Sequence, residues 1–573
     1  MSSTLENRAG ILGSSPSAWD CSSESFFGQR RLHVWAVSIV LLVFMAFAIV
    51  KLGTSELGSD EGRFGVSALN LLHNPHQFAV VSEDPLGPPG TKPFGYPFLL
   101  AASILIFGKT VFALRIANVI ILVGGALFLY GFVELIMEER TAALLTFAFF
   151  LLNPGTVTYA RVAMPEPLVV AAGCFAMFCA AKFLTNGRLS WAAACGFAIG
   201  LGFLSKLWLV LPFALACFSV FAFQFFRERK GVVVTGVLLA CSSFVFVAAS
   251  HLILVLCLDP GSWQHWTGIY FLFSVGSRMA GHGYDPAMWY RPWWFYPAAL
   301  LKASFFGLPL LLLGIQSVRK QRQLLVAAVV CSLLLPVLAF SFFRVKQASY
   351  IYPVHPALAL LISLGFIYFK EAGRLEQLLV CLISIGAGAF LFFEHVLGVS
   401  EFTALTCLYL LYFTACVVGR RFGHASRYVV AAALFSALLF ADARVAKQTL
   451  QPPLYLSEIA DFFRPQLLKA RPEELVFTAP IFPAMEFYTF RGGEYWQTFY
   501  AHKSLAQVTD DLRRGAQVFY VVDRSQALYG SEVSPDKLQA LREYAVDATG
   551  QIEQKLGHSM PLRIFIPRAV AER

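Results

Sequence analysis

The chain has 573 residues, of which 57% are hydrophobic and only 14% are charged. Soluble proteins carry roughly 25% charged residues, so a soluble multidomain protein is excluded, and disorder is excluded because disordered chains are poor in apolar residues. The mean hydropathy of +0.63 indicates a polytopic membrane protein.

The net charge of +10 does not indicate nucleic-acid binding, because the basic residues fall in short clusters between apolar runs. Such clusters suit the anionic lipids of an inner leaflet. The eleven cysteines lie almost entirely inside apolar runs and show no zinc-ligand spacing. We interpret them as small core residues rather than as a disulfide framework.

Residues 1–33 are polar and end in Arg30 and Arg31, and no cleavage site follows the first apolar run. We therefore expect a cytoplasmic tail over 1–33 and a retained first span. Each run of about 20 apolar residues is taken as one crossing. The spans, about thirteen in all, are expected at 34–52, 110–136, 141–158, 166–184, 190–206, 207–226, 231–256, 294–316, 323–342, 350–369, 376–396, 402–419 and 428–446.

The distribution of basic residues supports this count of spans and the side of the membrane on which each loop lies. With the N-terminus inside, every tight basic cluster falls on the cytoplasmic side. The clusters are Arg140, Lys182 with Arg188, 227–230, 319–322, Lys370 with Arg374, and Arg420 with Arg421 and Arg427. The loops after residue 226 fall on the stated sides only if the apolar stretch 190–226 forms two spans. We divide it at Lys206.

Two long outer loops then follow, 53–94 and 258–293, and an odd number of crossings exports the tail. In that tail, 475–478, 518–522 and 562–566 are strand-like, and 456–469, 504–514 and 535–548 are helical. The expected fold is mainly α. A polytopic transmembrane helical bundle over 34–446 precedes a small extracytoplasmic α/β domain over 447–573.

The first outer loop places Asp60 and Glu61 at the start of a short amphipathic helix, with Arg63 close by and Lys92 further along. Two simpler interpretations stay open. Ser59 or Asp60 caps the helix, and Lys92 is a solvated or snorkelling lysine.

More polar groups collect on the predicted outer side. A carboxylate among several cations suits a reaction on an anionic lipid headgroup, because cations neutralise a phosphate while the carboxylate accepts a proton. Ordinary interfacial charge at helix ends is the alternative. The residues concerned are Arg161, Glu166, Lys206, Arg278, His282, Asp285, Arg291, Arg344, Lys346 and Tyr350.

Other site motifs are absent from the sequence. It contains no nucleotide P-loop, no Gly-x-Ser-x-Gly elbow and no His-Glu-x-x-His zinc helix. His73 and His76 flank an Asn-Pro pair and are interpreted as a loop feature rather than as metal ligands.

The segment Asp60-Glu61-Gly62-Arg63-Phe64 resembles an element of the membrane-embedded C-type (GT-C) glycosyltransferases. The branch it resembles holds the aminoarabinose (lipid A) transferases and the protein O-mannosyltransferases. Further stretches are similar to family elements in the same order. They are Lys92-Pro93, 161–167, 202–206, 291–297 and Lys346 to Pro353.

This resemblance implies transfer of a monosaccharide from a polyprenyl-phosphate donor to a lipid, glycan or protein hydroxyl at the outer face of the plasma (inner) membrane. By the same resemblance, Asp60 would activate the acceptor, and Lys92, Lys346 and Tyr350 would hold the donor phosphate. Arg63 and Glu166 would support the site by the same resemblance. We further expect Glu61, Arg161, Lys206, Arg278 and Arg291 as supporting residues.

The chain departs from the family pattern at Phe64, where tyrosine is frequent, and at Thr91, where an acid is frequent. In relatives that use a metal, that acid can be a ligand, so we expect no metal and no other cofactor here.

A transporter or flippase of lipid-linked saccharide is the alternative function. It predicts ionisable residues near mid-bilayer and two symmetric halves. The sequence shows few buried charges and no such repeat, which favours the enzyme. It leaves the sugar, the acceptor and the oligomeric state open.

Overall fold

The structure is a computed structural model of the chain. It describes residues 23–73, 75, 94–227, 230–258, 290–304, 307–320, 323–369, 455–469, 475–478, 487–488, 517–523, 542–560 and 562–568, with isolated positions at 373, 376, 379, 382–386 and 539.

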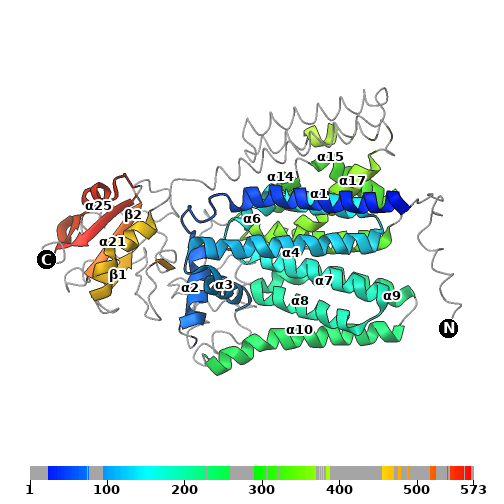
Figure 1. Cartoon of the computed structure of the whole chain (residues 1–573), viewed down its shortest axis with the longest axis horizontal. Helices are drawn as coiled ribbons and strands as arrows, with labels where there is room; N and C mark the ends of the chain where they lie inside the picture. Colours follow the sequence, from blue (N-terminus) through cyan, green and yellow to red (C-terminus); the bar gives the residue numbers. More distant parts are fainter. Residues whose placement is uncertain are drawn as a thin grey trace.

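Most of the described helices form a bundle whose members run nearly side by side (Figure 1). Its helices are α1 (Ser23–Ile49), α4 (Val111–Met137), α5 (Arg140–Leu151), α6 (Pro154–Ala160), α7 (Glu166–Asn186), α8 (Leu189–Lys206), α9 (Leu211–Arg227), α10 (Lys230–Leu258), α14 (Phe295–Ser304), α15 (Leu308–Lys320), α16 (Leu324–Ser341) and α17 (His355–Tyr368). Two 3-10 turns belong to it, η3 (Leu207–Val210) and η6 (Ala348–Val354).

The bundle is apolar enough to lie in a membrane. Among the described residues, six helices have the length and composition of membrane spans, or seven if the bent pair α5 and α6 is one span. The part of α1 from His33 to Ile49 is a shorter apolar helix. The expected spans at 402–419 and 428–446, and most of 376–396, lie outside the described residues. The total of about thirteen therefore stays a prediction.

The stretch Leu189–Phe226 is one of the six by length and composition, but it turns back on itself between α8 and α9. The backbone of Leu207 has a φ of 33° and breaks the helix just after Lys206. Gly173 of α7 packs on Phe213, and Phe183 packs on Phe221, so α7 and α9 run in the same direction. The division at Lys206 is therefore present in the structure.

Two predicted spans differ from the structure in detail. The span expected over 141–158 is broken at Asn153 and Pro154, where α5 and α6 meet at a bend of 58°. Proline lacks the N–H that would continue the helix, and the Asn153 side chain accepts from the Gly155 amide to start the next one. The span expected over 294–316 is two helices, α14 and α15.

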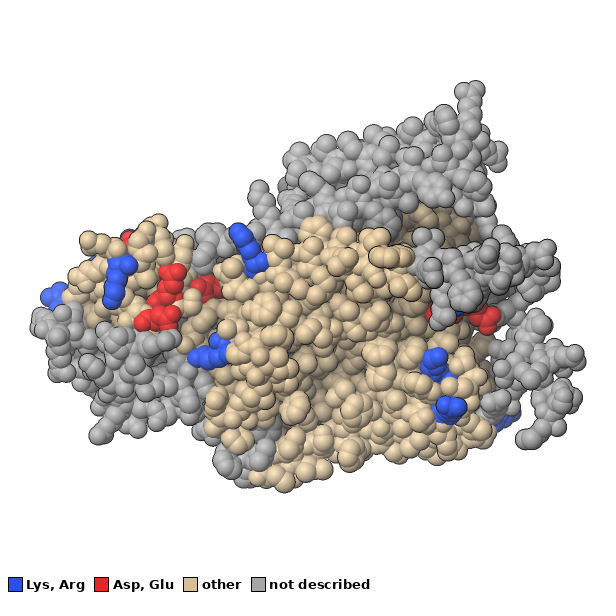
Figure 2. Space-filling model, in the orientation of Figure 1, with Lys and Arg blue, Asp and Glu red and all other residues tan. Residues whose placement is uncertain are grey.

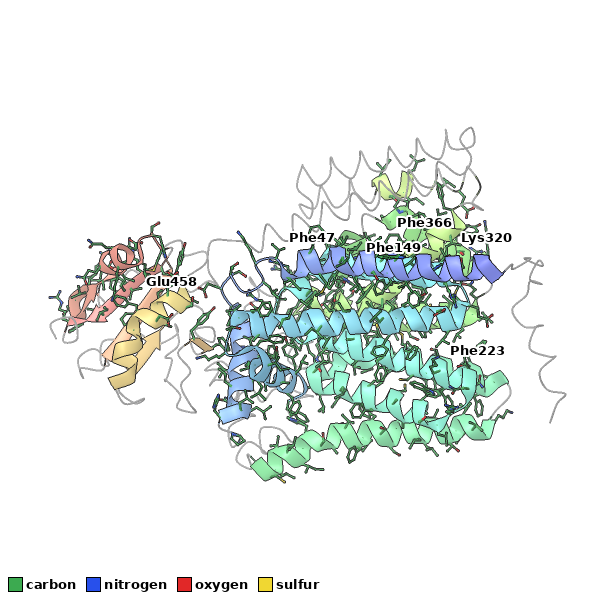
Figure 3. All side chains as sticks on the ribbon, viewed as in Figure 1. Phe47, Phe149, Phe223, Lys320, Phe366 and Glu458 are labelled. Carbon is green, nitrogen blue, oxygen red and sulfur yellow. The ribbon has the colours of Figure 1, made fainter. Side chains whose placement is uncertain are left out.

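Small residues let the helices approach closely, as is usual where lipid supplies no hydrophobic driving force. A Cβ on Gly314 of α15 would lie 1.9 Å from the carbonyl oxygen of Leu361 in α17, so only glycine fits there. Aromatic side chains fill the remaining space. Phe47 of α1, Phe149 of α5 and Phe366 of α17 belong to this core (Figure 3).

The C-terminal part contains a four-stranded sheet in the order β1-β2-β4-β3. Strand β2 pairs parallel to β1, and β4 pairs antiparallel to both β2 and β3. The strands are β1 (Leu475–Thr478), β2 (Gln517–Asp523), β3 (Ala545–Asp547) and β4 (Leu562–Pro567), accompanied by α21 (Leu456–Lys469) and α25 (Thr549–Leu556). Three strands and α21 match the sequence prediction.

The helix predicted over 535–548 is wrong at its end, where β3 stands instead. Asp547 accepts a hydrogen bond from the Thr549 amide at 3.0 Å, and that contact starts α25 two residues later. The helix predicted over 504–514 lies outside the described residues. Whether the sheet is a separate exported domain also stays a prediction.

Two short helices, α2 (Ser59–His73) and α3 (Gly95–Phe107), lie across the end of the bundle that faces the sheet (Figure 1). One hydrophobic cluster joins α2, α3 and the start of α4 to α21, α25 and β4. The N-terminal end of α1 lies at the opposite end of the bundle (Figure 1). Between the two ends, the described surface in Figure 2 carries almost no charged residue, as expected of a membrane belt.

Candidate active site

The candidate catalytic residue Asp60 lies in the first turn of α2, as the sequence predicts. Its side chain is 51% exposed, and one carboxylate oxygen lies 3.9 Å from the guanidinium of Arg63. Carboxylates at a helix N-terminus are favoured by the helix dipole. Phe64, Ala68 and Leu69, further along α2, are buried, whereas Asp60 in the first turn is exposed.

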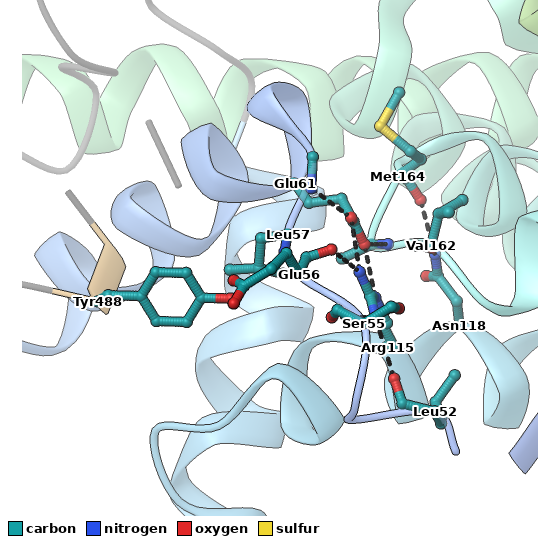
Figure 4. Close-up of polar contacts among 12 residues, drawn as sticks. Leu52, Ser55, Glu56, Leu57, Glu61, Arg115, Asn118, Val162, Met164 and Tyr488 are labelled. Carbon is teal, nitrogen blue, oxygen red and sulfur yellow. Dashed lines mark hydrogen bonds and ion pairs between the residues drawn. The ribbon is translucent and has the colours of Figure 1, made fainter. Parts of the chain in front are cut away.

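The neighbouring Glu61 points the other way and is buried. Its carboxylate forms a two-pronged ion pair with Arg115 of α4, with N···O distances of 2.8 and 2.9 Å (Figure 4). The amides of Gly58 and Ala163 also donate to it, each at 2.7 Å. These contacts tie the start of α2 to α4 and to the turn before α7.

Arg115 was not singled out by sequence analysis. Besides Glu61, it donates to the carbonyl oxygens of Leu52, Ser55 and Glu56 at 2.8 to 3.1 Å. It therefore ties the chain between α1 and α2 to the bundle. A signal was present, because Arg115 is an arginine inside an apolar run of 27 residues, and ionisable residues in spans usually have a role.

Asn118, one helical turn beyond Arg115, holds the turn before α7. Its amide nitrogen donates to the carbonyl oxygens of Val162 and Met164 at 2.6 and 2.9 Å, and its oxygen accepts from Tyr96. Together with the bond from the Ala163 amide to Glu61, these contacts fix the turn that leads to Glu166. Asn118 is a second residue that sequence analysis missed.

Glu166 begins α7 and is completely buried. Its Oε1 lies 2.5 Å from Nζ of Lys206, the last residue of α8. The ammonium of Lys206 also lies 5.6 Å from the centre of the Tyr350 ring in η6. With 22% of its side chain exposed, Lys206 is a cation that still reaches solvent. The structure thus brings three predicted site residues together.

Lys346 is buried just before η6. Its ammonium donates to the carbonyl oxygen of Arg291 at 2.9 Å and to that of Phe343. Burial lowers the pKa of Lys346. An ammonium has three donors, so the two carbonyls leave one direction for a further acceptor. The Arg291 side chain itself is exposed on the same segment, which pairs with 344–345.

Arg161 binds backbone carbonyl groups at the end of α1. Its Nη1 donates to the carbonyl oxygens of Phe47 and Val50 at 2.7 and 2.9 Å, at the end of α1. Cations favour a helix C-terminus because the free carbonyl groups concentrate negative charge there.

A chain of contacts therefore connects the predicted site from Asp60 through Glu61, the 162–166 turn and Lys206 to Tyr350. Lys92, Arg278, His282 and Asp285 lie outside the described residues. Within the described ranges no group of three or more His, Cys, Asp or Glu side chains is placed to hold a metal. Because the loop with Thr91 and Lys92 is not among them, the absence of a metal stays an expectation.

The arrangement has the parts of a group-transfer site. An exposed carboxylate can accept a proton. Fixed ammonium groups and a phenol hydroxyl group can donate hydrogen bonds to an anionic phosphate. All of them lie at the end of the bundle next to the sheet.

Residues 91–246 match the family model described as dolichyl-phosphate-mannose-protein mannosyltransferase. Among curated proteins, the chain is similar to the undecaprenyl phosphate-alpha-4-amino-4-deoxy-L-arabinose arabinosyl transferase 2 of Pseudomonas fluorescens, with 26% identity over 408 residues, 66% of each chain. It is also similar to the corresponding transferase of Pseudomonas aeruginosa, with 27% identity over 359 residues, 60% of this chain and 62% of that one. The match thus spans just under two thirds of these relatives' length.

Among solved structures, the fold is similar to that of ArnT from Cupriavidus metallidurans bound to undecaprenyl phosphate. The TM-score is 0.61 at 16% identity, over 93% of this chain and 97% of that chain. The resemblance to C-type membrane glycosyltransferases of the aminoarabinose transferase branch is thereby confirmed.

Proposed function

We propose that this chain, as a multi-pass inner-membrane glycosyltransferase of the C type, transfers a monosaccharide. The donor is a polyprenyl-phosphate-linked sugar, and the acceptor is a lipid at the outer face of the membrane. The curated relatives are named for an undecaprenyl-phosphate-linked aminoarabinose, so that donor class is the first to test. The ArnT structure of similar fold holds undecaprenyl phosphate, which supports the same carrier.

One observation carries the proposal. Asp60 projects into water from a helix start that Glu61 and Arg115 hold by buried charge-assisted hydrogen bonds. A general base needs this combination, because it must reach the acceptor while its backbone stays fixed.

In the proposed reaction, Asp60 accepts the proton of the acceptor O–H group. The acceptor oxygen forms a bond to the anomeric carbon as the bond from that carbon to the phosphate oxygen breaks. The electron pair of the broken bond stays on the polyprenyl phosphate, and the configuration at the anomeric carbon inverts. Donor and acceptor held at one site react faster than free molecules because their association entropy is already lost.

The leaving phosphate would be stabilised by Lys206, Lys346 and Tyr350, with Lys92 as a further cation from the first loop. Lys206 and Tyr350 are in contact with each other, and Lys346 precedes Tyr350 by four residues. Glu166 orients Lys206 by the 2.5 Å ion pair. Cations fixed in this way stabilise developing charge without reorganising.

The proposal includes a topology. The turns at the end of the bundle opposite the sheet carry Arg140, Arg188 and Lys230, which the positive-inside rule assigns to the cytoplasm. The N-terminus then lies in the cytoplasm, and α2, α3 and the C-terminal sheet lie outside.

The test uses the purified full-length protein with undecaprenyl-phosphate-linked aminoarabinose and lipid A. Release of undecaprenyl phosphate and formation of glycosylated lipid are measured together. We expect stoichiometric release and transfer by the wild type, and a rate about 10²–10⁴ lower for Asp60→Asn. Asp461→Asn, an exposed aspartate on α21, serves as the matched control.

Equal rates for the wild type and Asp60→Asn would overturn the role of Asp60. Movement of the intact donor across a vesicle membrane, without release of its phosphate, would favour a flippase instead.

A further inference from the structure

The C-terminal region reaches the start of α2 through two consecutive aromatic residues, Phe487 and Tyr488. Phe487 is fully buried in the hydrophobic cluster that also contains Leu57, Phe64 and Leu114. These two residues therefore pack on the helix that carries Asp60, although more than 400 residues of chain separate them from it.

Phe487 fits because α2 has a glycine at its contact point. A Cβ on Gly65 would lie 2.7 Å from Cδ2 of Phe487 and 3.0 Å from Cδ1 of Leu114. Glycine inside a helix weakens it, so its presence in α2 calls for a reason. The close approach of Phe487 supplies that reason.

Tyr488 contacts the residues immediately before α2. Its hydroxyl oxygen accepts from the amide of Leu57 at 3.3 Å and interacts with the carboxyl group of Glu56 (Figure 4). Its own carbonyl oxygen accepts from Nζ of Lys109, two residues before α4, at 3.3 Å. Tyr488 thus bridges two segments of the bundle end.

Glu56 is hydrogen-bonded both at its side chain and at its backbone carbonyl group. Oγ of Ser457, on α21, donates to its Oε1 at 3.3 Å, and its carbonyl oxygen accepts from Arg115 at 2.8 Å. Burial raises the pKa values of both the Glu56 carboxyl group and the Tyr488 phenol.

Glu56 and Leu57 lie four and three positions before Asp60. Because the Asp60 side chain is exposed, the backbone at the start of α2 must fix where its carboxylate lies. That backbone is bonded to Glu61 at Gly58 and to Tyr488 at Leu57.

We propose that Tyr488 is a positioning residue, through which the C-terminal region sets the place of the Asp60 carboxylate by holding Glu56 and Leu57. This inference rests on the proposed transfer reaction. It assigns the C-terminal region, which is distant from Asp60 in sequence, a role in that reaction.

The test compares Tyr488→Phe with the wild type in the full-length protein, using undecaprenyl-phosphate-linked aminoarabinose and lipid A. Tyr488→Phe keeps the ring and removes only the hydroxyl group. We expect kcat to fall about three- to tenfold, as for one hydrogen bond, with KM for the donor unchanged. Tyr544→Phe removes a hydroxyl just before the edge strand β3 and is expected to have wild-type kcat.

A second set of variants tests the contact with Phe487. Gly65→Ala is expected to lower kcat, because the new methyl group displaces the Phe487 ring. Gly65→Ala with Phe487→Leu is expected to recover part of the loss, because the smaller side chain makes room and coupled sites are not additive. Failure of the double variant to exceed Gly65→Ala would contradict a steric contact between the two residues.

Hydrogen–deuterium exchange gives a readout that needs no activity. Exchange over residues 56–66 should be faster in Tyr488→Phe than in the wild type, with no change in α7. Unchanged exchange there, or equal kcat for Tyr488→Phe and an active wild type, overturns the positioning role alone. No transfer by the wild type overturns the proposed function, and the positioning role with it.

Discussion

Among the described residues, both ends of the bundle carry ion pairs, but the pairs differ in burial. At the end next to the sheet, Glu61 and Arg115 are buried and fully paired, and Glu166 is buried against Lys206. At the opposite end, Glu134 and Arg140 are more than one third exposed, and Lys320 is half exposed (Figure 3).

This difference shows what each set of charges does. Exposed ion pairs are worth little and are screened by salt, so the far end needs no particular geometry to interact with lipid headgroups. Buried pairs cost desolvation and persist only where the geometry is held. The charged side chains at the end next to the sheet are therefore held in fixed positions. A catalytic or binding site requires such fixed positions, whereas contact with lipid headgroups does not.

The largest expected effect on stability comes from the buried pair Glu166–Lys206. Lys206→Met leaves the completely buried Glu166 without its cation, which should lower the free energy of unfolding by about 3–5 kcal/mol. Arg140→Met, at the exposed pair, should change it by less than about 1 kcal/mol. Chemical denaturation in detergent measures both. Equal losses would remove the distinction between the two ends.

A smaller effect is expected from Arg115→Lys, which keeps the charge but loses the planar fork that binds Glu61 and three carbonyl groups. The start of α2 should shift, and a shift of about 1 Å at a catalytic group costs on the order of 10² in rate. Sugar transfer at saturating donor measures this loss. Arg319→Lys at the other end of the bundle is the matched control, and a comparable loss there would contradict the account.

The smallest effect concerns pH and Glu56. Burial raises its pKa above the ordinary value of 4.5, so the folded protein binds its proton more tightly than the unfolded chain does. The free energy of unfolding should therefore fall as pH rises from about 4.5 through the raised pKa. Denaturation of the wild type and Glu56→Gln across that range should show a shallower fall for the variant. Parallel curves would mean that Glu56 titrates normally.

Local patterns were enough to predict much of this molecule. Apolar length predicted the helices, the motif around Asp60 predicted the start of α2, and a lysine in an apolar stretch marked the turn between α8 and α9. Each of these features is determined by residues that are neighbours in sequence. The strands β1, β2 and β4 were found for the same reason.

Contacts between distant segments were not predictable in this way. Arg115 and Glu61 are 54 positions apart, and Tyr488 and Leu57 are 431 apart. No spacing rule pairs such residues from one sequence. The bend at Asn153 and the break between α14 and α15 were missed because composition alone does not show where a long apolar run changes direction.

The central claim is that Asp60 lies in water on the outer face of the membrane. The direct measurement is labelling of Asp60→Cys by a membrane-impermeant maleimide in right-side-out and inverted vesicles, with Arg188→Cys as the control at the opposite end and the wild-type cysteines as background. The account predicts that Asp60→Cys is labelled in right-side-out vesicles and Arg188→Cys in inverted ones. Labelling of Asp60→Cys from the cytoplasmic side would contradict it.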